Sequence, residues 1–243
     1  MMKRSNLVVM FLLLTGVPAH SQQMAITLDD LPAQGEKPAG ITQMEIVQSI
    51  LSTLKQQRMP PTYGFINGKR AEEDASAPAV LMAWRAAGQP MGSHTWAHGY
   101  KIAEVNMEFE DYLWNAPYAR CMDKHDDAAI GRLHDSYLSA ADQFYGLFRQ
   151  LSQMVYGREV KYVLLMHVGA FDAKMLPELL AFYRNKGVRF ISLPSAISDP
   201  AYRDDPDIGA PHGGTLLELM MQKKKLGFPK NTKPYKELDD LCR

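Results

Sequence analysis

Short apolar runs alternate with amphipathic helical patterns along most of this chain, and this alternation restricts its fold more than any other feature. Four runs have the length and composition of buried strands, at 24–28, 63–66, 161–166 and 188–193. Helical patterns lie between or after them, over 42–57, 78–87 and 173–186. Strands separated by helices in this way form parallel sheets. The sequence therefore predicts an α/β fold with a parallel sheet or barrel.

The ends of several helices are marked in the sequence. Thr42 and Glu45 form a capping box, and Gly88 and Gly187 follow the ends of two helical patterns. Asp172 is expected to cap the helix over 173–186. A longer pattern over 126–156 places apolar residues three and four apart throughout. We expect this helix to pack on the sheet rather than to form a partner-binding coiled coil.

Composition excludes some classes of protein. Lys and Arg together number 27, and so do Asp and Glu. The chain therefore lacks the excess of basic residues that is typical of nucleic-acid-binding proteins. The hydrophobic fraction of 46% is enough for a core and excludes general disorder. Cys121 and Cys242 are too few for a disulfide scaffold and too far apart for a CxxC metal site, although they could pair in an oxidising compartment.

The N-terminus has the pattern of a secretory signal peptide. Lys3 and Arg4 precede the apolar stretch 7–17, which is short for a membrane span, and Ala19 and Ser21 suit a cleavage site. We expect residues 1–21 to be removed, which places the mature protein in the periplasm or outside the cell. The alternative is an uncleaved membrane anchor. Nothing after Gln22 is apolar enough to insert. The mature chain is expected to comprise one domain over 22–200 and a peripheral tail over 201–243.

Chemically capable side chains follow two of the predicted strands, and a histidine pair lies elsewhere in the sequence. Asp29 and Asp30 end the first strand, and His167 ends the strand over 161–166. His94 and His98 are four residues apart, a spacing that places both imidazoles on one side of a helical turn. The carboxyl ends of parallel strands are where ligands and catalysis collect. Each residue alone is more often structural, but together they suit a metal site with two histidines, one carboxylate and open positions.

These residues resemble the motifs of the polysaccharide deacetylase family, the NodB-homology domain of carbohydrate esterase family four. Thr27-Leu28-Asp29-Asp30 resembles its T-F-D-D motif, and Ser93-His94 with His98 resembles its H-[ST]-x-x-H motif. Leu165-Met166-His167 resembles its late L-x-H motif. The resemblance runs from about Met24 to Pro200. It implies a distorted, incomplete (β/α) barrel of about six parallel strands with surrounding helices, and a divalent metal, usually zinc.

The resemblance also implies roles for individual residues. Asp30, His94 and His98 match the metal ligands, Asp29 the general base and His167 the general acid. The implied reaction is hydrolysis of an N-acetyl group on an amino sugar, in which the acid protonates the departing amine.

A fourth motif of the family is matched imperfectly. Asp111 resembles the aspartate of an Asp-Trp motif, which orients the acid His167, but Tyr112 stands where the family has tryptophan. We expect Trp114 to supply a sugar-stacking wall or, alternatively, only to fill the core. Tyr112 and Leu165 are also expected at the substrate.

One expected segment is absent from the sequence. The family has an Arg-Pro motif between the histidine pair and the Asp-Trp motif, whose Arg steadies the base and whose backbone N–H helps hold the oxyanion. Here Ala116-Pro117-Tyr118-Ala119-Arg120 has such residue types, but it follows Asp111. Only about two residues separate His98 from the next loop and strand, whereas a whole βαβ unit needs about thirty or more. We infer an internal deletion near 98/99, with the barrel open or rearranged there.

Two functions from different classes remain open on the sequence alone. The first is a metal-dependent deacetylase of chitin- or peptidoglycan-type glycans, weakened by the missing segment. The second is a non-catalytic metal- or glycan-binding remnant of the same fold. An iron oxygenase shares the ligand set but is usually an all-β protein, which the predicted helices oppose. The expected partner is a glycan, with neither nucleic acid nor membrane involved after signal cleavage.

Overall fold

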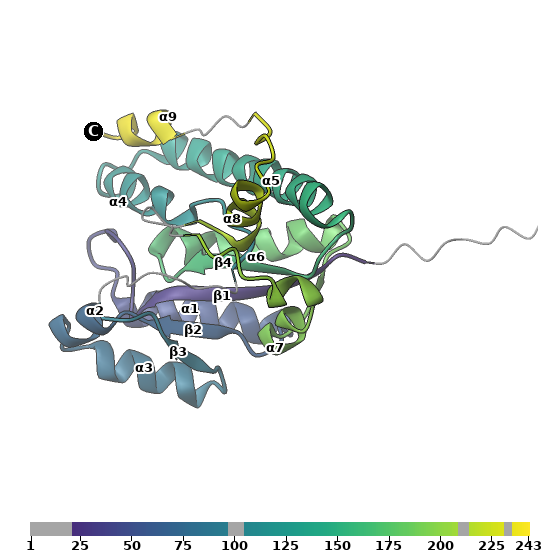
Figure 1. Cartoon of the computed structure of the whole chain (residues 1–243). Helices are drawn as coiled ribbons and strands as arrows, with labels where there is room; N and C mark the ends of the chain where they lie inside the picture. Colours follow the sequence, from purple (N-terminus) through teal and green to yellow (C-terminus); the bar gives the residue numbers. More distant parts are fainter. Residues whose placement is uncertain (1–20, 97–104, 209–213, 231–234) are drawn as a thin grey trace, which may run out of the picture.

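Parallel strands run side by side through the centre of the protein (Figure 1), and the residues that the structure describes form a sheet of five. The computed structural model describes residues 21–96, 105–208, 214–230 and 235–243. The strands lie in the order β3-β2-β1-β4, and β5 pairs with the start of β1. Their bounds are β1 (Gln23–Leu31), β2 (Tyr63–Ile66), β3 (Met91–Ser93), β4 (Tyr162–His167) and β5 (Arg189–Phe190). The sheet is not closed, as the predicted incomplete barrel requires.

The outer edge of β4 carries a sixth, very short pairing. Met107 forms a parallel bridge with Leu164, and the N–H of Leu165 donates to the Met107 carbonyl at 2.9 Å. The side chain of Asn106 accepts from the N–H of Val163 at 2.8 Å. This pairing is a single bridge rather than a strand. The expectation of an α/β fold with a parallel sheet is confirmed, with five strands among the described residues where the resemblance implies about six.

Helices surround the sheet. In Figure 1, α4, α5 and α9 lie above the strands, and α2 and α3 lie below them. The bounds are α1 (Gln43–Gln56), α2 (Gly68–Glu73), α3 (Ala77–Ala86), α4 (Asn115–Asp123), α5 (Asp127–Tyr156), α6 (Ala170–Asn185), α7 (Leu193–Ile197), α8 (Leu216–Lys223) and α9 (Tyr235–Asp240), with the 3-10 turns η1 (Asp111–Trp114) and η2 (Pro200–Arg203). The capping box of Thr42 and Glu45 begins α1 as expected.

The two faces of the sheet have different cores. Met24, Ile26 and Leu28 of β1 belong to the large core under α1, α5 and α6, and Ala25 belongs to a small cluster with Val163. Both faces of β1 are buried because neighbouring residues of a strand point to opposite sides. β1 is thus the central strand from which the other strands take their positions.

Two predicted elements differ in extent from the structure. The strand expected over 188–193 is only Arg189–Phe190, because α7 begins at Leu193 with Ser192 as its N-cap and a proline in its first turn. Asp172 does not cap α6. The helix begins earlier, at Ala170 after the N-cap Gly169, so that Asp172 lies inside its first turn and is buried.

The C-terminal region is not the peripheral tail that we expected. Thr215 and Glu218 form a second capping box at the start of α8. The apolar residues of α8 belong to the large core, and the helix packs on α5: Leu216, Leu217, Met220 and Met221. Leu238 of α9 is also buried there. The residues after 214 therefore contribute to the stability of the domain.

A disulfide fastens the C-terminus to the body of the protein. Cys121 of α4 pairs with Cys242, directly after α9, with their Cα atoms 5.2 Å apart. The guanidinium of Arg120 donates to the carbonyls of Leu238 and Leu241 beside it. The pairing that the sequence left open is thus present in the structure.

Loss of this disulfide should destabilise the protein. The double variant Cys121→Ser/Cys242→Ser should lose about 2–5 kcal/mol in the free energy of unfolding, because the bond closes a long loop of the unfolded chain. Denaturant titration followed by circular dichroism measures this loss. A reducing agent should lower the stability of the wild type and leave the double variant unchanged. An equal midpoint for the two proteins would contradict the prediction.

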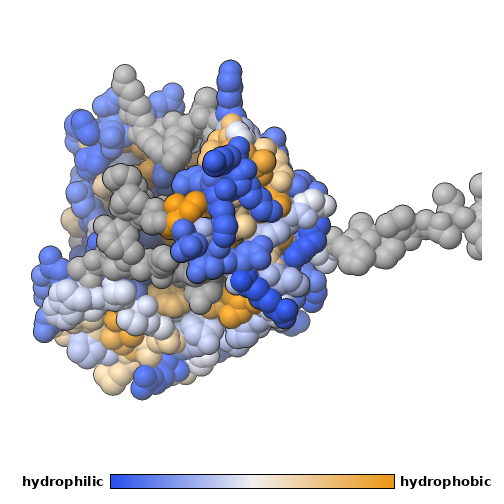
Figure 2. Space-filling model, in the orientation of Figure 1, coloured by the Kyte–Doolittle hydropathy of each residue, from blue (hydrophilic) through white to orange (hydrophobic). Residues whose placement is uncertain are grey.

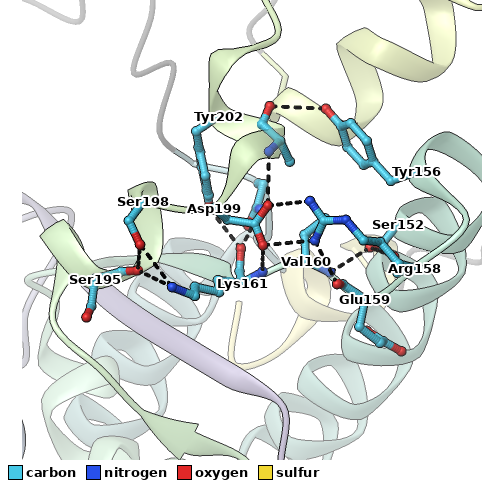
Figure 3. A network of polar contacts seen from close by, with 12 residues as sticks. Ser152, Tyr156, Arg158, Glu159, Val160, Lys161, Ser195, Ser198, Asp199 and Tyr202 are labelled. Carbon is cyan, nitrogen blue, oxygen red and sulfur yellow. Dashed lines mark hydrogen bonds and ion pairs between the residues drawn. The ribbon is translucent and has the colours of Figure 1, made fainter. Parts of the chain in front are cut away.

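Asp199 ties the start of β4 to the segment after α7 (Figure 3). Its carboxylate accepts two hydrogen bonds from Arg158, at 2.6 and 3.0 Å, and others from the N–H groups of Lys161 and Ala201. Burial acts to raise the pKa of Asp199, but these hydrogen bonds outweigh it and hold the pKa below its usual range. The ionised form is therefore the one that the fold favours.

The Asp199 network should make stability depend on pH in the acid range. Because the pKa is lowered on folding, its contribution is present above the unfolded value of about 4 and is lost as the pH falls further. Asp199→Asn should cost about 1–3 kcal/mol at pH 7 and should flatten the loss of stability below pH 4. Unfolding at pH 7 and pH 3 tests this, with the exposed Glu36→Gln as a control. An unchanged pH profile in Asp199→Asn would argue against it.

Over the described residues, no helix is both long and apolar enough to cross a membrane. The predicted signal peptide lies outside these residues, apart from Ser21. On the face shown in Figure 2, hydrophobic residues form small patches among hydrophilic ones.

Candidate active site

The carboxyl ends of β1, β3 and β4 bring four of the predicted site residues together. Asp29 and Asp30 lie near the end of β1, His94 follows β3, and His167 ends β4. Asp29 and His167 are partners in the parallel register. This register places the candidate base and the candidate acid on neighbouring strands at the edge where parallel sheets hold their ligands.

The two aspartates share one histidine. His94 Nε2 lies 3.6 Å from Asp29 Oδ2 and 3.9 Å from Asp30 Oδ1, and both carboxylates are 1% exposed. Adjacent residues of an extended strand point to opposite faces. Asp30 departs from this rule because its φ is +64°, in the left-handed region, which aspartate tolerates better than most residues. The unusual backbone explains how both carboxylates reach the same imidazole.

Asn67 is a site residue that the sequence analysis missed. It follows β2, is buried, and donates from Nδ2 to Asp30 Oδ1 at 2.9 Å. Its place directly after a predicted strand was the available signal, but the Asn67-Gly68 pair indicated only a turn. The hydrogen bond fixes the orientation of the Asp30 carboxylate.

Asp30 and His94 fit a shared metal ion. A tetrahedral zinc with bonds of about 2.0–2.2 Å holds its ligand atoms about 3.4 Å apart. The two atoms here are 3.9 Å apart, so a small closing movement would bring both to one ion. The third predicted ligand, His98, lies outside the described residues. Within the described part of the chain, no three His, Cys, Asp or Glu side chains form a cluster suited to a metal.

His167 and Asp111 form a buried pair. His167 Nδ1 lies 2.8 Å from Asp111 Oδ1, and the His167 N–H donates to Asp111 Oδ2 at 2.7 Å. The two contacts fix both the ring and its backbone, and they leave Nε2 as the nitrogen available to a ligand. Asp111 therefore occupies the place that the imperfect fourth motif indicates.

Burial and neighbouring charges shift the pKa values of both Asp29 and His167. Burial raises the pKa of Asp29 to about 7; His167 opposes the rise, and Asp30 and Asp111 add to it. Burial alone lowers the pKa of His167, but Asp111, with a smaller effect of Asp29, outweighs it and raises the value to about 9. At neutral pH His167 is therefore a cation that can donate a proton. Nearby positive charge, such as a metal ion, favours the ionised form of Asp29.

A further buried carboxyl group, that of Asp172, lies near the His167–Asp111 pair. Asp172 accepts from Asn115 Nδ2 at 2.8 Å and from the Tyr137 hydroxyl at 3.0 Å. Asn115 also accepts from the N–H of Phe171, which ties α4 to α6. Burial raises the pKa of Asp172 well above its usual range, and the charge of Asp111 adds to this. The network holds η1, which carries Asp111, against the helix that follows His167.

The three predicted substrate residues lie in different environments. Trp114 is fully buried, packs on Phe109 and Tyr137, and donates to the Ser136 hydroxyl. A sugar cannot reach it, so the expected stacking wall is wrong and the core alternative holds. Tyr112 is 36% exposed and packs edge-on against His167, with ring centroids 5.1 Å apart. The half-buried Leu165 packs against the small cluster around Val163.

No arginine takes the role of the missing Arg-Pro motif within the described residues. Asp29 has neither a lysine nor an arginine as an ion-pair partner among them. Arg120 is bonded instead to the carbonyls of the C-terminal residues.

The sequence matches a known protein family over its first half. Residues 16–120 match the family model described as polysaccharide deacetylase, a little less than half of the chain. The match includes Asp29, Asp30, His94 and Asp111, and it ends before His167. No protein of curated function matches the chain.

Solved structures with weak similarity include the following three proteins. A chitin deacetylase of Colletotrichum lindemuthianum is 17% identical, with a TM-score of 0.45, over 72% of this chain and 86% of that one. A CE4 family pseudoenzyme of Bacillus anthracis is 13% identical, with a TM-score of 0.42, over 73% and 66%. A peptidoglycan deacetylase of Bdellovibrio bacteriovorus is 16% identical, with a TM-score of 0.41, over 72% and 54%.

The hydrogen bond from Asn67 should matter for metal binding. Partners that orient a metal ligand typically contribute 10–100-fold in affinity, so Asn67→Ala should weaken zinc binding by about that factor. Isothermal titration of the metal-free protein measures it, with Asn185→Ala at the exposed end of α6 as the matched control. Equal zinc affinity in Asn67→Ala and the wild type would show that Asn67 does not support a metal ligand.

Proposed function

We propose, because residues 16–120 match the polysaccharide deacetylase family model, that this protein is a metal-dependent hydrolase that removes N-acetyl groups from amino-sugar polymers or oligomers of the chitin or peptidoglycan type. The observation that carries the proposal is the meeting of Asp29, Asp30 and His94 at one sheet edge, beside the His167–Asp111 pair. These residues supply a candidate metal site, a base and an acid.

Asp30 and His94, together with His98, are the residues that would hold the metal. The chemistry that a divalent metal, zinc above all, supplies in such a site is polarisation of the acetyl carbonyl and a lower pKa for water. Asp30 is suited to this role because it is buried and its carboxylate is oriented by Asn67.

Asp29 is the proposed general base. One of its oxygens, Oδ1, is buried and has no hydrogen-bond partner in the described part of the chain, so the protein leaves this lone-pair site unused. A pKa of about 7 matches the base to neutral pH, where proton transfer from water is most effective.

His167 is the proposed general acid. Asp111 holds its Nδ1, so a proton on Nε2 can pass to the nitrogen of the departing amine. The pKa of about 9 keeps this proton in place until the amine forms. Base and acid stand on adjacent strands, and the acetyl carbon would lie between them.

The missing segment should weaken this chemistry. Ser93 ends β3 and the β4-edge pairing begins near Val105, which leaves too few residues for another strand, helix and strand. The family's Arg and one oxyanion donor lie in that segment. The absence of a lysine or arginine beside Asp29, among the described residues, agrees with this loss.

A non-catalytic metal- or glycan-binding protein is the second candidate function. The observation that favours it is the absence of a lysine or arginine beside Asp29 among the described residues, since a base without its orienting cation is a poor base. The parallel α/β sheet disfavours the third candidate, an iron oxygenase, which is usually an all-β protein.

We also propose that the protein acts in the periplasm or outside the cell. The charged and apolar pattern of residues 3–21 supports export. The Cys121–Cys242 disulfide supports an oxidising compartment.

We expect this chain to show weak or undetectable deacetylase activity, and we expect restoration of the missing segment to recover it. Zinc-loaded protein is incubated with N-acetylglucosamine oligomers, and mass spectrometry follows acetyl loss. A family-type segment inserted between His98 and Gly99 should raise the rate by at least about 10²-fold, the value of one oxyanion donor. Asp29→Ala in the restored protein should abolish it.

Two results would contradict this prediction. Turnover by the present chain near 10 per second, an ordinary enzyme rate, would show that the segment is not needed. Activity that survives Asp29→Ala would show that Asp29 is not the base.

A further inference from the structure

Trp96 stands apart from the other tryptophans of the chain. The sequence has three, and Trp84 and Trp114 are fully buried, whereas Trp96 is 57% exposed. It lies two residues after His94, at the edge of the sheet where the candidate site is built. A large apolar side chain beside a catalytic site is typical of a surface that contacts a ligand.

The backbone around Trp96 is held firmly. The N–H of Gly68 donates to the Thr95 carbonyl at 3.0 Å, and the N–H of Lys69 donates to the Trp96 carbonyl at 2.8 Å. Gly68 also leaves room for the indole, because a Cβ atom at this position would lie 3.1 Å from Trp96 Cε3. Thr95 adopts a left-handed φ of +61°, which a β-branched residue rarely does. The exposed ring is therefore anchored at its base rather than left on a loose loop.

Tyr112 lies on the other side of the site. It packs on His167 at the end of β4, whereas Trp96 follows β3. Three strand spacings separate β3 from β4 in the sheet order, which corresponds to about 14 Å along the sheet. Strand β1, which carries Asp29 and Asp30, lies between these two strands in the sheet. The distance exceeds the width of one sugar ring.

We propose that Trp96 forms one wall of a glycan-binding site, on which a sugar ring of an oligosaccharide stacks while a neighbouring sugar lies over the site toward Tyr112. This inference rests on the proposed function, because it assumes that the ligand is a glycan. The ring carbons of an amino sugar present an apolar C–H face that suits the face of an indole, and its polar groups remain in water. Recognition at this distance requires an oligomer, so a single N-acetylglucosamine should bind poorly.

Solvent exposure alone would not identify Trp96 as a ligand-binding residue. Met82 on α3 is 65% exposed and has no comparable place near the candidate site. Single exposed apolar residues are ordinary, and the face in Figure 2 carries several small patches of them. Trp96 differs in its anchored backbone, its ring type and its place next to His94.

Intrinsic fluorescence tests the proposal directly, because Trp96 is the exposed fluorophore. Adding the N-acetylglucosamine tetramer to the wild type should shift or quench the emission, and adding the monomer at equal concentration should not. In Trp96→Ala the emission of the buried tryptophans should not respond to the tetramer. Calorimetric titration should show tetramer affinity reduced by at least about tenfold in Trp96→Ala and largely retained in Trp96→Phe.

Met82→Ala is the matched control and should bind as the wild type does. The proposal is overturned if the tetramer leaves wild-type fluorescence unchanged, or if Trp96→Ala, folded by circular dichroism, binds it with wild-type affinity. Equal binding of monomer and tetramer would overturn the requirement for an oligomer. These titrations measure binding and not acetyl loss, so tetramer binding supports the Trp96 wall whether or not the separate mass-spectrometric test of the proposed reaction succeeds.

Discussion

The parallel pairing of β1 with β4 is the constraint on which the site depends. It sets Asp29 opposite His167, and these residues lie far apart in the sequence. A slip of one residue would turn one of the two side chains to the other face of the sheet. The register is fixed by burial, since both faces of β1 are covered and Met24, Ile26 and Leu28 must face the large core. The positions of base and acid thus follow from the packing of apolar residues that take no part in chemistry.

Elements whose signals are local could be predicted from the sequence. The capping box of Thr42 and Glu45 fixes the start of α1, and the apolar spacing of the longest helix gives α5 almost to the residue. Elements whose extent depends on tertiary contacts could not be predicted from the sequence. β5 is short because α7 begins at once, and α8 is part of the domain because its apolar residues meet α5, which composition in a Pro- and Gly-rich region hides.

The same division holds for the site. Motif order singled out Asp29, Asp30, His94, His167 and Asp111, because each falls in a short sequence pattern that can be recognised without knowledge of the fold. Asn67, Asn115 and Asp172 were missed because their roles depend on partners that the fold brings near. Trp114 was misjudged for a related reason: an aromatic residue next to a motif can face either side of its 3-10 turn, and only packing against Phe109 and Tyr137 decides which.

The Cys121–Cys242 bond divides the candidate site between two topologically different parts of the chain. His167 lies on the covalent ring that the bond closes, whereas Asp29, Asp30, His94 and Asp111 lie on the open N-terminal arm. In the oxidised unfolded protein the ring already has reduced conformational freedom, and the arm does not. The site therefore forms when the unconstrained N-terminal part of the chain packs against the part that the disulfide has already restricted. The parallel pairing of β1 with β4 joins these two parts of the chain.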